Sequence, residues 1–303
     1  MTVPPLLYAY AIVAIPSERE IVTNHLHRMS GIDAAPVTLV SDAGQMRPES
    51  MAVLVSAVDA STYAPEQVES RVGQLEWLAP RAEAHDRVVT AAADAAPVIP
   101  LPIFSLFRDE AAIRTMLAER RDELSRLFTH LRGAREYTVR IYRDDAMLNA
   151  ALSELSPHIR ELESGAEQAS PGQRYLLQRK LEEARRTELR RVSGEIAQPA
   201  YRALAPLARA SVREPLPAAT TAAEARGGGG SAQPAILNAS FLVDDERLDD
   251  FRRALSELIA LRAPAGCRVD FTGPWPAYHF ARETSSSATT SSASKPDGEE
   301  LDG

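Results

Sequence analysis

The first 107 residues alternate apolar runs with amphipathic segments, and the order of these segments constrains the fold more than any other feature of the chain. Residues 6–15, "LLYAYAIVAI", are rich in Tyr, Ile and Val, which is typical of a buried strand. Pro16 ends this run, and "SERE" at 17–20 is a capping box that predicts the start of a helix. We expect that helix to end at Gly31.

Four further segments complete the pattern. Residues 36–46 and 50–59 are expected to form two strands joined by a polar turn. Apolar residues at helical spacing predict a helix over 65–95, which Pro80 should kink or split. Residues 96–107 are extended and apolar, and their three prolines favour an edge strand or an irregular strand. The order strand, helix, strand, strand, helix, strand predicts a ferredoxin-like antiparallel sheet over residues 1–108, with helices on one face.

The second half also mixes helix and strand patterns. A helical stripe runs from Asp109 to Gly133, and "EYTVRIY" at 136–142 alternates like a half-buried strand. Helical patterns with many Glu/Arg pairs follow, broken at Pro157, and two strands flanking a helix close the domain. We therefore predict a C-terminal α+β domain over 109–283, a modified ferredoxin-like fold with a long helical insertion.

Two segments have compositions typical of chain without a packed core. Residues 214–234 contain a run of four glycines and are expected to form a flexible loop. Residues 284–303 are rich in Ser and Thr and then in acids, which predicts a disordered tail. No Gly-Lys-Ser/Thr follows the glycines Gly227–Gly230, so we do not interpret them as a phosphate loop.

Composition narrows the class of protein. The 303 residues carry a formal net charge of −8, so the chain has no general attraction for nucleic acid or anionic lipid. Its single cysteine, Cys267, cannot form an intramolecular disulfide, which fits a reducing cytoplasm. No apolar stretch approaches the ~18–20 residues of a membrane span, and the N-terminal apolar run lacks the basic region of a signal peptide.

The histidines, the cysteine and their neighbours do not form a recognisable catalytic or metal-binding motif. His25 and His27 are two apart on a predicted helix and do not face each other. His85 and Asp86 are adjacent on a helix and diverge by about 100 degrees, so they are not a catalytic dyad. Cys267 has no basic motif around it and is expected to fill the core. We predict no catalytic, metal or cofactor site.

The segment Arg174–Arg191 holds seven positive residues and three acids. One interpretation is a solvated helix surface whose charges pair with one another. The other is an electrostatic docking site for an acidic partner. The sequence leaves both open.

Aromatic residues and prolines are concentrated at 271–280, "FTGPWPAYHF". In a structural interpretation, Gly273 turns the chain, Pro274 and Pro276 stiffen it, and the aromatic rings fold back as a lid on the core. In a functional interpretation, the same rings form a rigid patch that binds an apolar partner. The two interpretations are compatible.

Several segments together resemble the gas vesicle protein F/L family. They are "LLYAYAIVAIP", "SMAVLVSAV", "HDRVVTAAADAAPVIPLPIFSLF", "LRGAREYTVRIY", "GQRYLLQRK", "ILNASFLVD" and "FTGPWPAYHF". The last is the most specific, because family members typically carry Gly-Pro-Trp-Pro-Pro-Tyr-Ser-Phe there. The residues that match this motif are Gly273, Pro274, Trp275, Pro276, Tyr278 and Phe280.

The chain departs from the family pattern at two places. Ala277 and His279 replace a proline and a serine of the C-terminal motif. After the long N-terminal helix the family usually shows Pro-Leu-Arg-Phe-Gly-Thr, of which Pro100 and Leu101 remain. The other four positions hold Pro102, Ile103, Phe104 and Ser105.

The resemblance implies a non-enzymatic accessory protein of gas vesicle assembly that has two α+β domains and no cofactor. It further implies a cytoplasmic location in association with gas vesicles. The implied partners are the small hydrophobic shell protein and other accessory proteins, not nucleic acid or a lipid membrane. Two alternatives stay open: a ligand-binding regulator or enzyme built on ferredoxin-like domains, and a structural component that stays in the finished vesicle. The resemblance does not separate F-type from L-type members.

Overall fold

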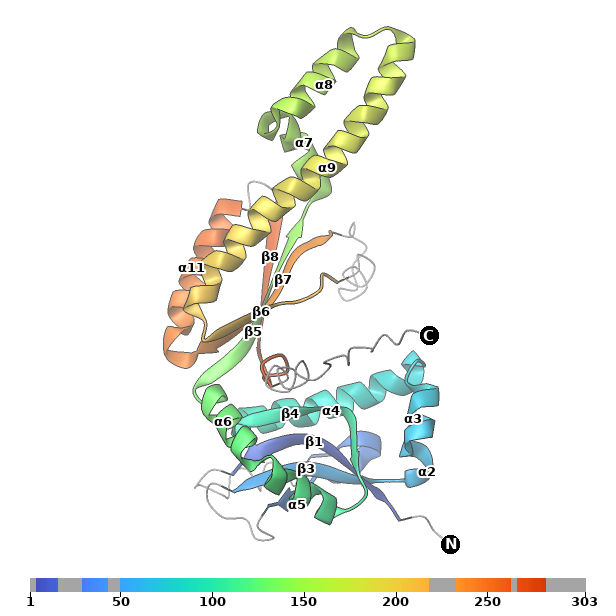
Figure 1. Cartoon of the computed structure of the whole chain (residues 1–303), viewed down its shortest axis with the longest axis vertical. Coiled ribbons are helices and arrows are strands. Elements are labelled where there is room, and N and C mark those ends of the chain that lie inside the picture. The colour runs from blue at the N-terminus through green and yellow to red at the C-terminus, as the bar shows by residue number, and fades with distance from the viewer. Residues whose placement is uncertain (1–3, 16–28, 43–49, 218–232, 263–265, 282–303) are drawn as a thin grey trace, which may run out of the picture. The chain divides into compact units, whose positions relative to one another are not determined.

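The computed structural model describes residues 4–15, 29–42, 50–217, 233–262 and 266–281. Contacts within the chain divide it into two compact units (Figure 1). One unit comprises Met1–Arg132 together with Pro276–Gly303, and the other comprises Gly133–Trp275. The predicted helix that begins at Ser17, the glycine run at 227–230 and the tail at 284–303 lie outside the described residues.

The N-terminal unit contains a four-stranded antiparallel sheet in the order β2-β3-β1-β4. Its strands are β1 (Leu6–Ala14), β2 (Thr38–Ser41), β3 (Met51–Val58) and β4 (Val98–Phe107). The first strand lies between the third and the fourth, as a split β-α-β arrangement requires. The predicted ferredoxin-like fold class is confirmed.

A bulge in β1 changes which of its residues face the apolar cluster on one side of this sheet. The register of β1 shifts between Ala9 and Ala11 against both of its neighbours, so Tyr10 is the extra residue of a bulge. Tyr8 and Tyr10 share a face, as residues two apart in a strand do. After the bulge, Ala11 and Val13 continue on that same face in the apolar cluster that contains Val88. The bulge explains why strict alternation along 6–15 does not assign the two faces correctly.

The predicted helix over 65–95 is two helices in the structure, and a further short helix precedes them. The two are α3 (Pro65–Arg71) and α4 (Leu75–Ala95), and the short helix before them is α2 (Ala60–Tyr63). The break lies at Val72–Gln74, where Gln74 has an extended backbone, and Pro80 lies inside α4 without ending it. The side chain of Asp59 accepts a hydrogen bond from the Ser61 amide and so caps α2.

Two more helices belong to the N-terminal unit and cover the other face of its sheet. Helices α5 (Glu110–Glu119) and α6 (Arg121–Leu131) contact strands of this sheet, and their apolar stripes are buried. The division by contacts places both helices in the unit that includes Met1–Arg132, whereas the sequence predicted a boundary at residue 108. The stripe on residues 109–131 showed that a face would be buried, but it did not show which sheet would bury it.

The second unit repeats the same strand order with a larger crossover. Its sheet runs β6-β7-β5-β8, so the first strand again lies between the third and the fourth. The strands are β5 (Ala134–Arg143), β6 (Ala210–Arg213), β7 (Ala235–Asp244) and β8 (Cys267–Trp275). Helix α11 (Leu248–Arg262) forms the second crossover. This arrangement confirms the modified ferredoxin-like fold of the C-terminal domain.

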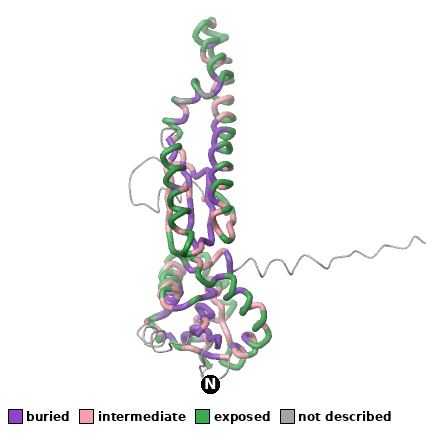
Figure 2. Tube along the Cα trace, turned by 90° about the vertical axis from the view of Figure 1, so that its left-hand side faces the viewer, coloured by how far each residue is buried: buried purple, intermediate pink, exposed green. Residues whose placement is uncertain are grey.

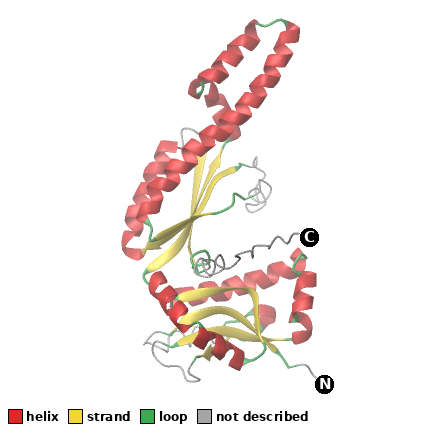
Figure 3. Ribbon diagram, in the orientation of Figure 1, coloured by secondary structure: helices red, strands yellow, loops and turns green. Residues whose placement is uncertain are grey.

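Three helices occupy the first crossover of the second unit. They are α7 (Asp145–Leu155), α8 (Pro157–Gln168) and α9 (Pro171–Leu204), and the break between the first two falls at Pro157 as predicted. The C-terminal half of α9 packs on the sheet through residues such as Val192, Ile196 and Ala200. Its N-terminal half pairs with α8 as a hairpin that extends beyond the sheet (Figure 3). Figure 2 shows that exposed residues predominate at the far end of this hairpin.

Among the residues that the structure describes, no helix has both the length and the apolar composition needed to span a membrane.

Candidate partner-binding surfaces

The C-terminal motif begins at a position that only glycine fits. Gly273 has a φ of 126°, and a Cβ added there would lie 2.8 Å from the Glu136 carbonyl oxygen and 3.0 Å from Cδ1 of Tyr137. Two residues later Trp275 is paired with Glu136 in the β5–β8 ladder. The backbone that presents the tryptophan is therefore fixed by the sheet.

Trp275 and Phe280 of this motif have opposite environments. The Trp275 side chain is 43% exposed, whereas Phe280 is 2% exposed. Trp275 ends the second unit, and the chain from Pro276 onward belongs to the N-terminal unit. There the Tyr278 hydroxyl donates a hydrogen bond to Oδ1 of Asp86 at 2.8 Å. The structure thus buries Phe280 at the end of the motif and leaves the Trp275 ring partly exposed.

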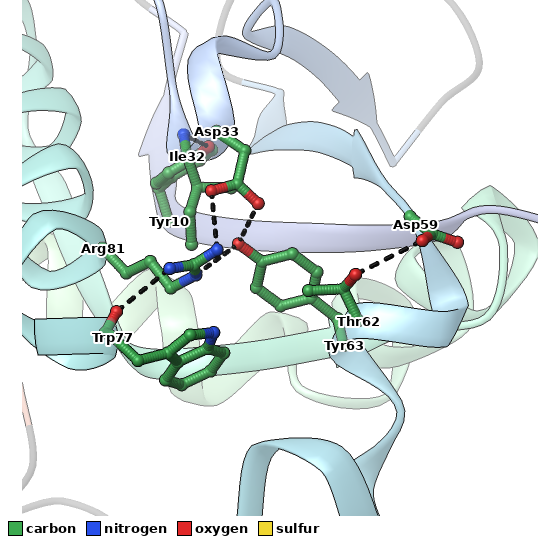
Figure 4. A network of polar contacts seen from close by, with 8 residues as sticks. All are labelled: Tyr10, Ile32, Asp33, Asp59, Thr62, Tyr63, Trp77 and Arg81. Atoms are coloured by element: carbon green, nitrogen blue, oxygen red, sulfur yellow. Dashed lines mark hydrogen bonds and ion pairs between the residues drawn. The ribbon is translucent and has the colours of Figure 1, made fainter. Parts of the chain in front are cut away.

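A second feature of the N-terminal unit is an arginine held among aromatic rings (Figure 4). Arg81 donates hydrogen bonds from Nε to the Tyr63 hydroxyl at 2.9 Å and from a terminal nitrogen to the Trp77 carbonyl oxygen at 3.1 Å. It also forms an ion pair with Asp33 at 2.9 Å, and its guanidinium lies 4.5 Å from the centre of the Trp77 ring. The Tyr63 hydroxyl donates to the other oxygen of Asp33 at 2.6 Å. These groups satisfy one another, so the arrangement stabilises structure rather than offering a vacant anion site.

Strained backbone gathers beside the same cluster. Among the described residues, the non-glycine residues with positive φ are Asp33, Ala34 and Phe104. The Phe104 ring stacks on Trp77 with centroids 5.2 Å apart. A left-handed conformation costs a non-glycine residue about 1–2 kcal/mol, so packing must hold Phe104 in place. Phe104 occupies the position at which the resembled family pattern has glycine.

A buried histidine, His85, is linked to this cluster through the Tyr8 ring, which contacts both His85 and Tyr63. The Nδ1 atom of His85 is 2.8 Å from the Tyr8 hydroxyl, and the ring also hydrogen-bonds the Leu101 carbonyl. Burial lowers the pKa of His85 to about 4, although the Leu101 bond and the charge of Asp86 act in the opposite direction. His85 is therefore neutral at pH 7 and serves as a hydrogen-bonded core residue.

The other candidates for a catalytic or metal-binding role either have structural roles or lie outside the residues that the structure describes. Asp86 binds Tyr278 rather than His85, and Cys267 is buried in the second apolar core. His25 and His27 are not among the described residues. Within the described part of the chain, no group of three or more His, Cys, Asp or Glu side chains is arranged to hold a metal ion.

The basic segment of α9 is only partly self-paired. Arg185 forms an ion pair with Glu163 at 2.7 Å, and Arg191 pairs with Glu188 at 2.8 Å and with Glu195. Five other positive side chains of this segment have no ion pair within the described residues: Arg174, Arg179, Lys180, Arg186 and Arg190. The self-paired interpretation therefore holds for Arg185 and Arg191, and the docking interpretation stays a prediction for the other residues.

Sequence reasoning found the C-terminal motif but missed the arginine–aromatic cluster. Trp77 and Arg81 are four residues apart on one helix, a spacing that predicts contact. Asp33 is 48 residues away from Arg81 in the sequence, and no pattern joins the two.

Comparisons with known proteins agree with this fold. Residues 6–282 match the family model described as gas vesicle synthesis protein GvpL/GvpF. The chain is 27% identical over 237 residues to gas vesicle protein L of Streptomyces sp. (strain CB03234), covering 78% of this chain and 82% of that protein. It is 25% identical over 285 residues to gas vesicle protein L1 of Halobacterium salinarum, covering 90% and 89%.

Solved structures show the same architecture. The crystal structure of the gas vesicle protein GvpF from Anabaena sp. PCC7120 superposes with a TM-score of 0.60 at 19% identity, covering 91% of this chain and 96% of that one. GvpF from Microcystis aeruginosa superposes with a TM-score of 0.57 at 18% identity, covering 92% and 99%. Because the family model matches nearly the whole chain, this protein belongs to the GvpL/GvpF family of gas vesicle synthesis proteins.

Proposed function

We propose that this chain is a non-enzymatic accessory or minor structural protein of gas vesicle assembly, which binds the hydrophobic shell protein and other accessory proteins in the cytoplasm. The observation that carries the proposal is the family match over residues 6–282. A shell that excludes water needs subunits with large apolar faces, and such faces aggregate before assembly. A partner that covers those faces, or that seeds ordered addition, solves this problem.

The end of β8 is the surface that we propose for the shell subunit. Trp275 combines an exposed ring with a backbone fixed by β5, so binding would require little additional ordering. Tryptophan is also among the residues most enriched where binding energy is concentrated. Gly273, Pro274, Pro276, Tyr278 and Phe280 serve in this proposal to hold the ring in position.

The edge of the second sheet supports the same location. In the described sheet β8 is an end strand of nine residues, whereas the opposite end strand β6 has four. An unpaired strand edge accepts an extended segment of a partner through main-chain hydrogen bonds. In the N-terminal sheet, Pro100 and Pro102 remove two backbone donors from the end strand β4, whereas β8 lacks one, at Pro274, so the β8 edge is better suited to strand addition.

A ligand-binding regulator or an enzyme remains a less favoured function. The polar groups that gather in the N-terminal unit, Asp33, Tyr63 and Arg81, bind one another rather than converging on an open position. No observation on the described residues favours catalysis over partner binding.

Co-purification tests the proposal. The tagged chain would be co-expressed with the shell protein of the same genome, in parallel with Trp275→Ala and with Leu216→Ala, which truncates another exposed apolar side chain. We expect the wild type and Leu216→Ala to retain soluble shell protein and Trp275→Ala to lose it while keeping the same melting temperature.

Two outcomes would contradict parts of the proposal. If the wild type retains no shell protein although both proteins are well behaved alone, shell binding is wrong and contacts with other accessory proteins would have to explain the function. If Trp275→Ala retains it fully, the end of β8 is not the surface. Detection of the chain in washed, purified vesicles would assign it as a minor structural component rather than a transient assembly factor.

A further inference from the structure

Two small surfaces of this chain combine exposed apolar side chains with unpaired charges of opposite sign. The first, which we name the basic face, lies on the N-terminal half of α9. It consists of Tyr175, Leu176, Arg179, Lys180, Arg186 and Arg190. The second, which we name the acidic corner, lies where α3 ends and α4 begins. It consists of Glu66, Glu69, Val72, Leu75, Glu76 and Glu83.

Helical spacing brings the members of the basic face together. Tyr175, Arg179, Arg186 and Arg190 follow one another at intervals of four, seven and four residues, which places them on one side of α9. The Tyr175 side chain is 62% exposed, and Leu176 beside it is 60% exposed. Two acids, Glu182 and Glu183, adjoin the four positive residues, so this face has a net charge of +2.

The acidic corner has the complementary character. Its apolar centre is Leu75, which is 75% exposed, together with Val72. The four glutamates are exposed and have no ion pair within the part of the chain that the structure describes. Two positive residues adjoin them, Arg71 at the end of α3 and the exposed Arg87 four residues after Glu83, so the corner has a net charge of −2.

We propose that the basic face of one copy of this chain docks on the acidic corner of a second copy. Each surface has an apolar centre of two large side chains and a charged rim, which is the composition of a small protein interface. Opposite rims attract and set the orientation of docking. Like rims repel, and the net charge of −8 disfavours non-specific contact between copies. The pairing therefore joins unlike surfaces rather than two copies of the same surface.

Such a contact is head to tail, and it leaves one free surface of each kind on a bound pair. Further copies then add until a ring closes or a filament grows. Neither surface includes Trp275, so self-association and binding of another protein at the end of β8 are independent properties. The inference does not rest on the proposed function.

Charge reversal with rescue tests the docking. Sedimentation of the full chain would be followed from roughly 1 µM to roughly 1 mM, the range of weak association. It would be measured at about 0.1 M salt, where charges interact over about 10 Å, and at about 1 M, where the screening length is about 3 Å. We expect the average mass to rise with concentration at low salt and to stay monomeric at high salt.

Arg179→Glu/Arg186→Glu reverses the basic face, and Glu69→Arg/Glu76→Arg reverses the acidic corner. Each pair alone should weaken association about tenfold or more, since exposed pairs contribute roughly 0.2–1 kcal/mol each and reversal turns attraction into repulsion. A mixture of the two variants, or the four changes in one chain, should restore association. All four positions are exposed, so unchanged melting curves provide the folding control.

Three results would overturn the proposal. The first is a chain that stays monomeric throughout the concentration range at low salt. The second is association that neither reversal weakens. The third is a loss in one variant without rescue in the mixture, which would mean that the basic face or the acidic corner binds something other than this chain.

Discussion

Replacing Phe104 by alanine and by glycine tests whether the left-handed backbone at this position is strained. Phe104 has a φ of 64° within β4, and its amide donates to the Tyr8 hydroxyl at 3.3 Å. Its ring stacks on Trp77 and is partly buried. The backbone conformation and the ring contacts therefore act in opposite directions on stability.

The magnitudes follow from these two contributions. Removal of the ring loses an aromatic pair worth about 0.5–1.5 kcal/mol and about 1–2 kcal/mol of apolar burial. Both variants suffer this loss. Alanine keeps the left-handed cost of about 1–2 kcal/mol, whereas glycine removes it and adds about 0.5–1 kcal/mol of unfolded-chain entropy. Phe104→Gly should therefore be more stable than Phe104→Ala by about 0.5–1 kcal/mol.

Urea denaturation of both variants measures the difference. The neighbouring Ser105 provides the control, because its φ is not positive and it lies in the same strand. At Ser105 alanine should be more stable than glycine, the usual order in a strand. An alanine variant at 104 that equals or exceeds the glycine variant would refute the reasoning. A double-mutant cycle with Trp77→Ala should give a coupling of about 0.5–1.5 kcal/mol for the stacked rings.

Three other perturbations test the buried histidine and the C-terminal motif. Because the pKa of His85 falls from an ordinary value of 6.5 to about 4, its contribution to stability is complete above pH 6.5 and is lost as the pH falls towards 4, by up to about 3 kcal/mol. Thermal unfolding should show this loss in the wild type and a smaller one in His85→Gln; equal pH dependence would contradict it. Gly273→Ala should cost about 2–3 kcal/mol in urea, against about 1 kcal/mol for Gly133→Ala, where an added Cβ meets nothing within 4 Å. Phe280→Ala should cost about 3 kcal/mol and Trp275→Ala less than about 1 kcal/mol in the same assay, and similar losses would show that the two rings are equally buried.

The sequence predicted the fold because each domain carries two independent signals. Strand and helix periodicities fix the type of each element, and their order leaves few ways to close a sheet. The assignment of α5 and α6 to the first sheet was not predictable, since an apolar stripe is the same whichever sheet it covers. The bulge at Tyr10 was also hidden, because an added residue in a strand of apolar side chains leaves no change in composition.

The candidate surfaces were predictable to different degrees. Turn residues and aromatics made the C-terminal motif visible, but neither indicates that Phe280 is buried while Trp275 is exposed. The acidic corner depends on the break at Val72–Gln74, which the sequence pattern assigned to Pro80. The ion pair between Asp33 and Arg81 forms because the fold brings distant segments together, and sequence patterns within either segment do not predict it.

The structural and functional interpretations of the C-terminal motif require each other. An exposed tryptophan on a mobile chain would lose much of its binding energy to ordering, so a useful ring must be held from both sides. Gly273 supplies one anchor through its fit against Glu136, and buried Phe280 supplies the other. Each substitution should therefore abolish binding of the shell protein for a different reason. Trp275→Ala should remove the contacting ring from a stable protein, and Phe280→Ala should destabilise the protein that presents the ring. A Phe280→Ala variant that is destabilised yet binds fully at low temperature would show that the anchor is not needed for presentation of the ring.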